Sequence, residues 1–223
     1  MNAKLFLQAI LKFLSGLVLV GALLFLPAGT FAYPQAWLLI GILFVPMFAA
    51  GLVMLKKSPA LLERRLRLNE EQAEQKTVLV LSGLMFLAAF LVAGFNFRFG
   101  WIRLPAWVSY AAALLFLAGY ALYAEVLREN VWLSRTVEVQ ENQQLIDTGL
   151  YGLVRHPMYM CTLLLFLSMP LVLGSVLSFA IMLLYLPIIA KRIRNEERVL
   201  EDGLAGYAAY KKRVRHRLIP FVW

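Results

Sequence analysis

Long stretches without a charged side chain alternate with short polar segments along this chain of 223 residues. The uncharged stretches cover residues 13–55, 77–97, 104–124 and 156–190. Because the hydrocarbon layer of a bilayer is about 30 Å thick, about 20 helical residues are needed to cross it. The pattern therefore predicts membrane spans near residues 8–27, 35–55, 77–97 and 105–125, followed by a shorter pair near 159–173 and 175–190.

Helix is the predicted structure of every span. Lipid offers the backbone no hydrogen-bond partner, so a spanning segment must satisfy its own N–H and C=O groups. The alternation typical of a barrel strand is not found in the sequence. Only Gly174-Ser175 separates the last two spans, which predicts a tight hairpin that is either tilted or re-entrant. We expect an all-α polytopic integral membrane bundle of five to six transmembrane helices, with a C-terminal helical hairpin and a cytoplasmic lid.

Three polar segments separate or follow the spans. Residues 59–76 mix leucines with charged residues, which predicts either an amphipathic surface helix that begins at Pro59 or a solvated connection. Residues 128–155 form the longest polar segment, and a loop of this length is usually functional. From Lys191 onward we expect one helix to about Leu204 and then a second, basic helix. Aromatic rings favour the head-group layer, so Tyr33 and Trp37 are predicted at the membrane interface.

Basic residues are distributed unevenly between the two sides of the predicted bundle. With six spans and the N-terminus inside, 20 of the 22 Lys and Arg residues lie on the inner side, and only Arg98 and Arg103 lie outside. Since basic loops favour the cytoplasm, both termini are predicted to be cytoplasmic. The net charge of +9 then forms a one-sided basic surface. Anionic lipid head groups explain such a surface more simply than nucleic acid does.

Composition narrows the class of protein further. Hydrophobic residues make up 61% of the chain and the mean hydropathy is +0.73, which excludes an ordinary soluble domain. The first apolar run is long and is followed by others, so we do not expect a cleaved signal peptide. Cys161 is the single cysteine, which excludes an internal disulfide. No spacing of His, Cys and acidic residues predicts a metal site.

Two polar clusters flank the predicted C-terminal hairpin. The first surrounds His156, with tyrosines on either side and a proline suited to the first turn of a helix directly after it. The second contains Arg192 and Glu196, which are four residues apart and share a helical face. Each cluster has an ordinary interpretation, as an interfacial histidine or as a solvated ion pair. At the two ends of one hairpin, they together predict a polar site at the membrane surface.

The order of the motifs resembles the isoprenylcysteine carboxyl methyltransferase family, within the wider group of integral membrane methyltransferases that includes phospholipid N-methyltransferases. The resemblance covers roughly residues 128–223. The matching motifs are Leu145-Ile146-Asp147-Thr148-Gly149-Leu150-Tyr151, Arg155-His156-Pro157-Met158-Tyr159, Glu196-Glu197, Tyr207-x-x-Tyr210-Lys211-Lys212-Arg213 and Ile219-Pro220-Phe221. Members of the family often carry a histidine where this chain has Gln143-Gln144. We expect residues 1–223 to form one membrane domain, with N-terminal helices in 1–127 and a catalytic part in 128–223.

The resemblance implies an enzyme that uses S-adenosylmethionine (SAM) as its cofactor. It implies that Glu196 binds the cofactor's ammonium group and that Arg192 holds a substrate carboxylate, which makes these two the catalytic candidates. The implied cofactor-binding residues are Gln140, Gln143, Gln144, Leu145, Ile146, Tyr151, His156, Pro157, Met158, Tyr159 and Glu196. Methyl transfer to an ionised carboxylate needs alignment more than acid–base help, which agrees with these roles.

We therefore expect carboxyl O-methylation of an isoprenylcysteine-like or other amphiphilic carboxylate. One alternative is N-methylation of a phospholipid or aminolipid, for which Glu197 or Glu201 could act as the base. Another is a non-catalytic, lipid-binding membrane module. The expected partners are a lipid-like or prenylated small-molecule acceptor and membrane lipids, with no nucleic acid and no metal.

Overall fold

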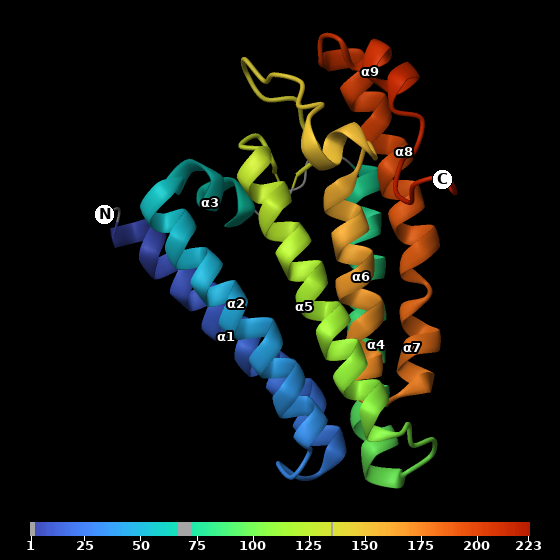
Figure 1. The fold of residues 1–223 in the computed structure, drawn as a ribbon. Coiled ribbons are helices and arrows are strands. Elements are labelled where there is room, and N and C mark those ends of the chain that lie inside the picture. The colour runs from blue at the N-terminus through green and yellow to red at the C-terminus, as the bar shows by residue number, and fades with distance from the viewer. Residues whose placement is uncertain (1–2, 67–72, 135) are drawn as a thin grey trace.

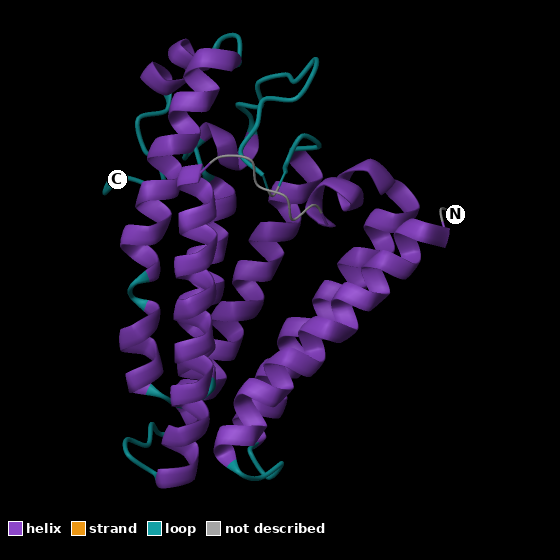
Figure 2. Cartoon of the chain, turned by 180° about the vertical axis from the view of Figure 1, so that it is seen from behind, coloured by secondary structure: helices purple, strands orange, loops and turns teal. Residues whose placement is uncertain are grey.

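The structure is a computed structural model that describes residues 3–66, 73–134 and 136–223 (Figure 1). Within these residues the chain forms helices joined by loops, without any strand (Figure 2). The predicted all-α class is therefore confirmed. In chain order the helices are α1 (Ala3–Ala28), α2 (Pro34–Lys57), α3 (Pro59–Leu66), α4 (Ala73–Phe99), α5 (Ala106–Glu129), the 3₁₀-helix η1 (Gly149–Gly152), α6 (Pro157–Val172), α7 (Val176–Met182), α8 (Tyr185–Gly203) and α9 (Tyr207–Arg213).

Most of the predicted spans reappear as long helices. Five segments of the described chain are long and apolar enough to cross a membrane: Lys4–Ala28, Pro34–Lys57, Gln75–Phe99, Ala106–Glu129 and Val176–Gly203. The first arm of the C-terminal hairpin, α6, is shorter, with 16 residues. The second arm is longer than the predicted 175–190, because helical structure resumes after a turn at Leu183 and Leu184 and continues to Gly203. The charged residues of α8 therefore project beyond its apolar part.

Proline marks the first residue of three helices. Pro34, Pro59 and Pro157 begin α2, α3 and α6. Proline suits this position because the missing N–H would have no helical acceptor there and the φ angle is already helical. The predicted helix starts at Pro59 and Pro157 are thus confirmed.

The predicted amphipathic segment begins as a short helix. In α3, Leu61 and Leu62 are buried, while Arg64 and Arg65 donate hydrogen bonds to the carbonyls of Val131 and Ser134 in the loop after α5. Of the predicted range 59–76, residues 67–72 lie outside the described residues, and α4 already includes residue 73.

The α1–α2 hairpin leans against a bundle made by α4, α5, α6 and the α7–α8 pair (Figure 1). Within the bundle α5 packs along α6, and α1 of the hairpin packs along α4. The hairpin is anchored at the end where Tyr33 is fully buried and its hydroxyl donates a hydrogen bond of 2.8 Å to the Leu173 carbonyl. Tyr33, which was predicted at the membrane interface, is thus packed inside the protein, whereas Trp37 is half exposed. At the opposite end the hairpin diverges from α5 (Figure 1).

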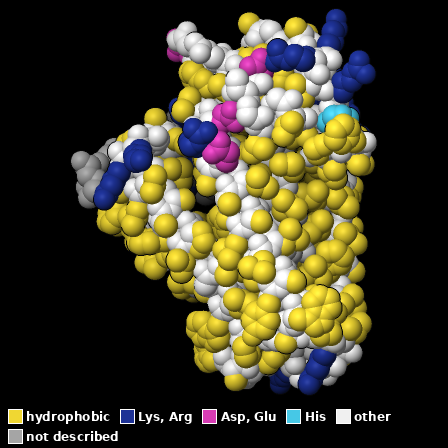
Figure 3. Space-filling view, in the orientation of Figure 1, with side chains coloured by type: hydrophobic (Ala, Val, Ile, Leu, Met, Phe, Trp, Pro, Cys, Tyr) yellow, Lys and Arg dark blue, Asp and Glu magenta, His cyan; other side chains and the backbone are white. Residues whose placement is uncertain are grey.

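Hydrophobic side chains cover most of the length of the molecule, and charged side chains gather at its ends (Figure 3). Val18, Val45 and Leu114 are among the most exposed of these apolar residues. A continuous apolar surface of this size would be unfavourable in water and suits contact with lipid. Together with the long apolar helices, it identifies an integral membrane protein.

The polar segments gather at one end of the bundle. The loop between α5 and η1, the C-terminal half of α8, and α9 all lie there, and the first residue of α6 faces them (Figure 1). This end therefore brings the two polar clusters of the sequence into one place.

Candidate active site

A cleft of about 790 Å³ lies at the polar end, between the loop before η1, the start of α6, α8 and α9. The predicted site residues that line it are Gln143, Gln144, Leu145, Ile146, Tyr151, His156, Pro157, Met158, Tyr159 and Glu196. Residues separated by about forty positions in the chain thus face one space.

Gln140 and Arg192 lie outside the lining of this cleft. The Gln140 side-chain amide donates to the Trp132 carbonyl at 2.6 Å, and its backbone N–H donates to the Gln143 side-chain oxygen at 2.9 Å. Gln140 therefore holds together the loop that forms one wall. Its predicted contact with a cofactor would require a different side-chain orientation.

Arg192 reaches the cleft through Tyr159. Its Nε donates to the Tyr159 hydroxyl at 2.8 Å, and this hydroxyl donates in turn to the Glu196 carboxylate. The guanidinium carbon also lies 5.9 Å from the centroid of the Tyr159 ring. Arg192 is buried, and charged hydrogen bonds of this kind are stronger than neutral ones. The result is a chain from Arg192 through Tyr159 to Glu196, which orients the Glu196 carboxylate at the wall of the cleft.

His156 stands at the entry to α6, between two carboxylates. Its Nε2 lies 3.4 Å from Glu197 Oε1, and its Nδ1 lies 4.0 Å from Glu196 Oε1. The imidazole stacks on Tyr159 with the ring centroids 5.7 Å apart. The ring is almost completely buried, so its orientation is set by these contacts rather than by solvent.

Glu197 is the main polar residue whose place the sequence analysis missed. Its Oε1 accepts a hydrogen bond of 2.7 Å from Arg155 Nε, and its Oε2 accepts one of 2.9 Å from Arg217 Nε. The carboxylate is 3% exposed, so it is enclosed by cations instead of water. Ile189, Ile193 and Glu197 repeat at intervals of four residues and lie on one buried face of α8. This repeat is the signal in the sequence that separates Glu197 from Glu196.

The hydrogen bonds from Arg155 and Arg217 to Glu197 weigh against the alternative in which Glu197 acts as the base for an amine acceptor. Hydrogen bonds from two arginines stabilise the ionised form of a carboxylate, which makes it a poor base for an amine. Glu201 instead forms a partly exposed ion pair with Lys211 at 2.5 Å. Neither residue lines the cleft.

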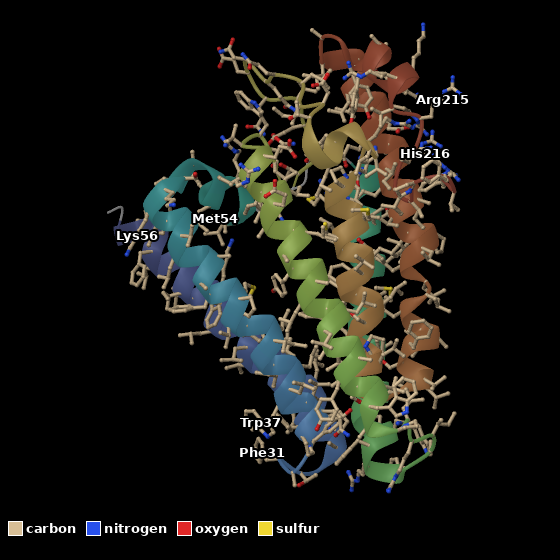
Figure 4. The ribbon with its side chains drawn as sticks, in the orientation of Figure 1. Phe31, Trp37, Met54, Lys56, Arg215 and His216 are labelled. Carbon is tan, nitrogen blue, oxygen red and sulfur yellow. The ribbon has the colours of Figure 1, made fainter. Side chains whose placement is uncertain are left out.

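The chain segment after α9 docks against the segment that carries His156. The N–H groups of Arg155 and His156 donate to the carbonyls of His216 and Arg217, each at 2.9 Å. The Arg155 guanidinium also donates to the Val214 carbonyl at 2.6 Å. Figure 4 shows the part of this segment with Arg215 and His216 alongside α8. Arg155 thus joins Glu197 and the C-terminal segment into one support beneath the cleft.

Two tyrosines of α9 line the cleft opposite the loop. The Tyr210 hydroxyl donates to the Tyr151 carbonyl at 2.7 Å, whereas the buried Tyr207 hydroxyl has no hydrogen-bond partner. Burial raises the pKa of both Tyr207 and Tyr210 well above the ordinary value, so each remains a neutral phenol that can donate a hydrogen bond. Because buried polar groups rarely lack a partner, the Tyr207 hydroxyl marks a position where a ligand would supply one.

Comparisons with known proteins were made for the whole chain. Residues 107–205 match the family of phospholipid methyltransferases, a range that runs from α5 through α8. The cobalt-zinc-cadmium resistance protein CzcN of Cupriavidus metallidurans is 33% identical over 112 residues, which is 48% of this chain and 49% of that protein. The Delta(14)-sterol reductase TM7SF2 of Mus musculus is 32% identical over 91 residues, which is 40% of this chain and 22% of that protein.

The chain thus spans about half the length of the first relative and about a fifth of the second. Their names describe different activities, so they do not assign one activity to this chain. Within the described residues, no group of three His, Cys, Asp or Glu side chains is placed to hold a metal ion. The family match confirms that the part of the chain which builds the cleft is similar to the integral membrane methyltransferases, the wider group indicated by its sequence motifs.

Proposed function

We propose that the protein is a membrane-embedded, SAM-dependent methyltransferase that methylates the carboxylate of an amphiphilic acceptor. One observation carries the proposal. Within the region that matches a methyltransferase family, the chain from Arg192 through Tyr159 directs the Glu196 carboxylate at a small-molecule cleft.

The cleft is suited to a cationic cofactor. Among the residues that the structure describes, its acidic members are Glu138 and Glu196, and its arginine, Arg155, is already paired with Glu197. These carboxylates favour a positively charged ligand. The aromatic faces of Tyr159 and Trp132 add to this attraction, because ring faces attract cations.

The unpartnered Tyr207 hydroxyl gives an independent test of the fit. SAM carries several hydrogen-bond acceptors, and the Tyr207 hydroxyl is a donor without a partner at the wall of the cleft, so the two complement each other. Glu138, whose Oε1 accepts a hydrogen bond of 3.0 Å from Thr136, offers acceptors for the hydroxyls of a ribose. In this proposal Glu196 binds the ammonium group, Tyr207 donates to an acceptor of the nucleoside, and Leu145 and Ile146 contact the adenine.

When bound, SAM supplies a methyl group on a positively charged sulfur, which transfers to a nucleophile aligned behind it. The protein's contribution is to orient, to neutralise charge and to exclude water. Tyr159 holds Glu196 in place, and α9 covers the cleft on one side. Arg192 reaches the cleft only through Tyr159, where it orients Glu196, so its direct contact with the acceptor carboxylate stays a prediction. An ionised carboxylate needs no base, so the engagement of Glu197 and Glu201 in ion pairs is compatible with this chemistry.

N-methylation of an aminolipid is the second candidate, and the match to phospholipid methyltransferases is the observation that favours it. An amine acceptor must lose a proton, which needs an available base near the cleft. The two carboxylates predicted for that task are both ion-paired, so carboxylate methylation is the better supported proposal.

Binding of SAM labelled on its methyl group to the purified protein tests the cofactor assignment. We expect Glu196→Ala to weaken binding by ten- to a hundredfold, which is the effect of losing one charged hydrogen bond. Glu141→Gln, an exposed acid of the loop that does not line the cleft, is the matched control and should bind normally. Unchanged affinity of Glu196→Ala would remove this residue from the proposal.

The acceptor class is tested by transfer of the label. The protein is incubated with labelled SAM and a panel of prenylcysteine analogues, fatty acids and aminolipids. Label released by mild base indicates a carboxyl ester, whereas base-stable label on lipid indicates methylated nitrogen. No transfer to any member of the panel, together with normal SAM binding, would favour the non-catalytic module.

A further inference from the structure

A second, larger cavity lies within the membrane part of the molecule. It encloses about 1,520 Å³ between the α1–α2 hairpin and the pair α5 and α6, where the hairpin diverges from the bundle. Figure 3 shows a hollow at this place, walled by hydrophobic side chains beneath a group of charged ones. This cavity is separate from the cleft described above, and the proposed cofactor does not use it.

The walls of this cavity are apolar along most of their length. Phe13, Phe48, Phe116, Phe166 and Met169 contribute to them. Figure 4 shows Met54, another lining residue, on the part of α2 near α3, while Lys56 lies toward the outer side of the molecule. Apolar walls at this depth suit a hydrocarbon chain, which loses no hydrogen bonds on entry.

Charge in the lining is of one sign. The charged members are Lys12 of α1 and Arg65 of α3, and the lining contains neither Asp nor Glu among the residues that the structure describes. The Lys12 ammonium donates to the carbonyl of Leu66, so both cations meet at the end of α3. Cations next to an apolar cavity of a membrane protein are costly and usually serve a function. An anionic head group would offset that cost, whereas an ammonium head group would increase it.

Arg65 stands between the two cavities. One of its guanidinium nitrogens, Nη1, lies 3.6 Å from the Met158 sulfur and 3.3 Å from the Ser134 carbonyl oxygen. Met158 and Ser134 both line the cofactor cleft. The other nitrogen, Nη2, donates to the Tyr123 hydroxyl, and Tyr123 lines the apolar cavity. An anion held by Arg65 would therefore lie at the boundary of the cleft, with its tail in the apolar cavity.

We propose that the cavity between α1–α2 and α5–α6 binds the tail of a single-chain amphiphile whose carboxylate is held by Arg65, next to Met158. This inference rests on the proposed function, since it identifies the acceptor of that reaction as an anionic amphiphile and Arg65 as its head-group ligand. An aminolipid fits less well, because the lining offers its ammonium group no carboxylate.

Photo-crosslinking without cofactor tests this inference independently of methyl transfer. The probes share one alkyl chain with a diazirine near its end and differ in the head group, which is a carboxylate, a primary amine or a methyl ester. Labelled peptides are mapped by mass spectrometry. We expect the carboxylate probe to label peptides that contain Phe116 or Met169, and to label them more strongly than the other two probes do.

Variants at the two ends of the cavity sharpen the test. Arg65→Ala should reduce carboxylate labelling tenfold or more, as expected for loss of a charged hydrogen bond, and Arg65→Lys should retain part of it. Gly51→Phe should block the tail, because Gly51 lines the cavity and a side chain added there meets no atom within 4 Å. Lys56→Ala is the control for the loss of a cation, because Lys56 does not line the cavity. Gly41→Phe is the control for the added ring, because Gly41 lies on the same helix, outside the cavity, and an added side chain there also meets no atom within 4 Å. Both should label normally.

Two outcomes would overturn the inference. Equal labelling by all three probes, unaffected by Arg65→Ala, would mean that the cavity binds any lipid chain without selectivity for its head group. Labelling that persists in Gly51→Phe would place the tail elsewhere, even if Arg65→Ala does not fold. If the carboxylate binds as expected but SAM does not bind, then this inference stands and the proposed methyl transfer fails.

Discussion

Removal of the Glu197 carboxylate should loosen the C-terminal segment that supports the cleft. In Glu197→Ala, the Arg155 guanidinium loses its ionic partner while its side chain remains 4% exposed. Breaking a buried ion pair by removing one partner costs about 3–5 kcal/mol, because the other charge is left without compensation. Arg217 also loses its hydrogen bond to Glu197, although it is more exposed and contributes less.

Hydrogen exchange of the Arg155 and His156 amides is the direct measurement. These amides donate to the carbonyls of His216 and Arg217, so they exchange when the C-terminal segment opens. A loss of about 3 kcal/mol raises the opening constant by about two orders of magnitude, since each 1.4 kcal/mol is a factor of ten. The protein is compared in detergent with and without the substitution, at one pH and temperature.

Glu201→Ala provides the matched control for this measurement. Glu201 lies on the same helix and pairs with Lys211, but both side chains are about one-third exposed. A surface pair of this kind contributes about 0–1 kcal/mol, so exchange of the Arg155 amide should change by no more than about fivefold. If Glu197→Ala and Glu201→Ala have equal effects, then Glu197 does not hold the segment and the argument from burial is wrong.

Three further substitutions have defined expected results. Tyr207→Phe should leave the thermal stability of the ligand-free protein unchanged or slightly higher, because the hydroxyl is unpartnered, and should weaken SAM binding in calorimetry. Tyr159→Phe should weaken SAM binding by about tenfold without preventing folding, because it removes the hydroxyl that orients Glu196, the proposed ligand of the cofactor's ammonium group. Gly149→Ala should destabilise the protein by about 1–3 kcal/mol, because the backbone of Gly149 is left-handed, with a φ of +51°, and an added Cβ would lie 2.3 Å from the Glu129 carboxylate. Thermal unfolding measures the effect, and the control is Gly152→Ala, where an added Cβ would make an ordinary contact.

The predictions for the helices were the most accurate part of the sequence analysis, because they depend on local properties. Run length, proline position and the need to satisfy the backbone in lipid act within a single segment. The start of α6 at Pro157 follows directly from them. The helix predicted from Lys191 to about Leu204 is also confirmed, but it is not a separate element, since α8 runs without a break from the apolar arm to Gly203. Hydropathy reports only the apolar part of such a helix.

The site could be predicted as a set of residues but not as a network. Motif order brought His156 and Glu196 to one place, and ten of the predicted residues do line the cleft. The pairing of Glu197 with Arg155 joins positions 42 apart, and the contact of Arg65 with Met158 joins positions 93 apart. Helical periodicity assigns a residue to a face, but the partner on that face is supplied by another element.

The sequence by itself determined that this protein is a bundle of membrane helices and that its polar motifs resemble those of membrane methyltransferases. It could do so because the length of apolar runs and the spacing of motifs are properties of the sequence alone. Only the tertiary structure decided that Glu196 faces the cleft while its neighbour Glu197 is enclosed by arginines, that Tyr33 is buried, and that Arg65 joins an apolar cavity to the cleft. Adjacent or similar residues differ in role because burial and charge depend on what packs against them.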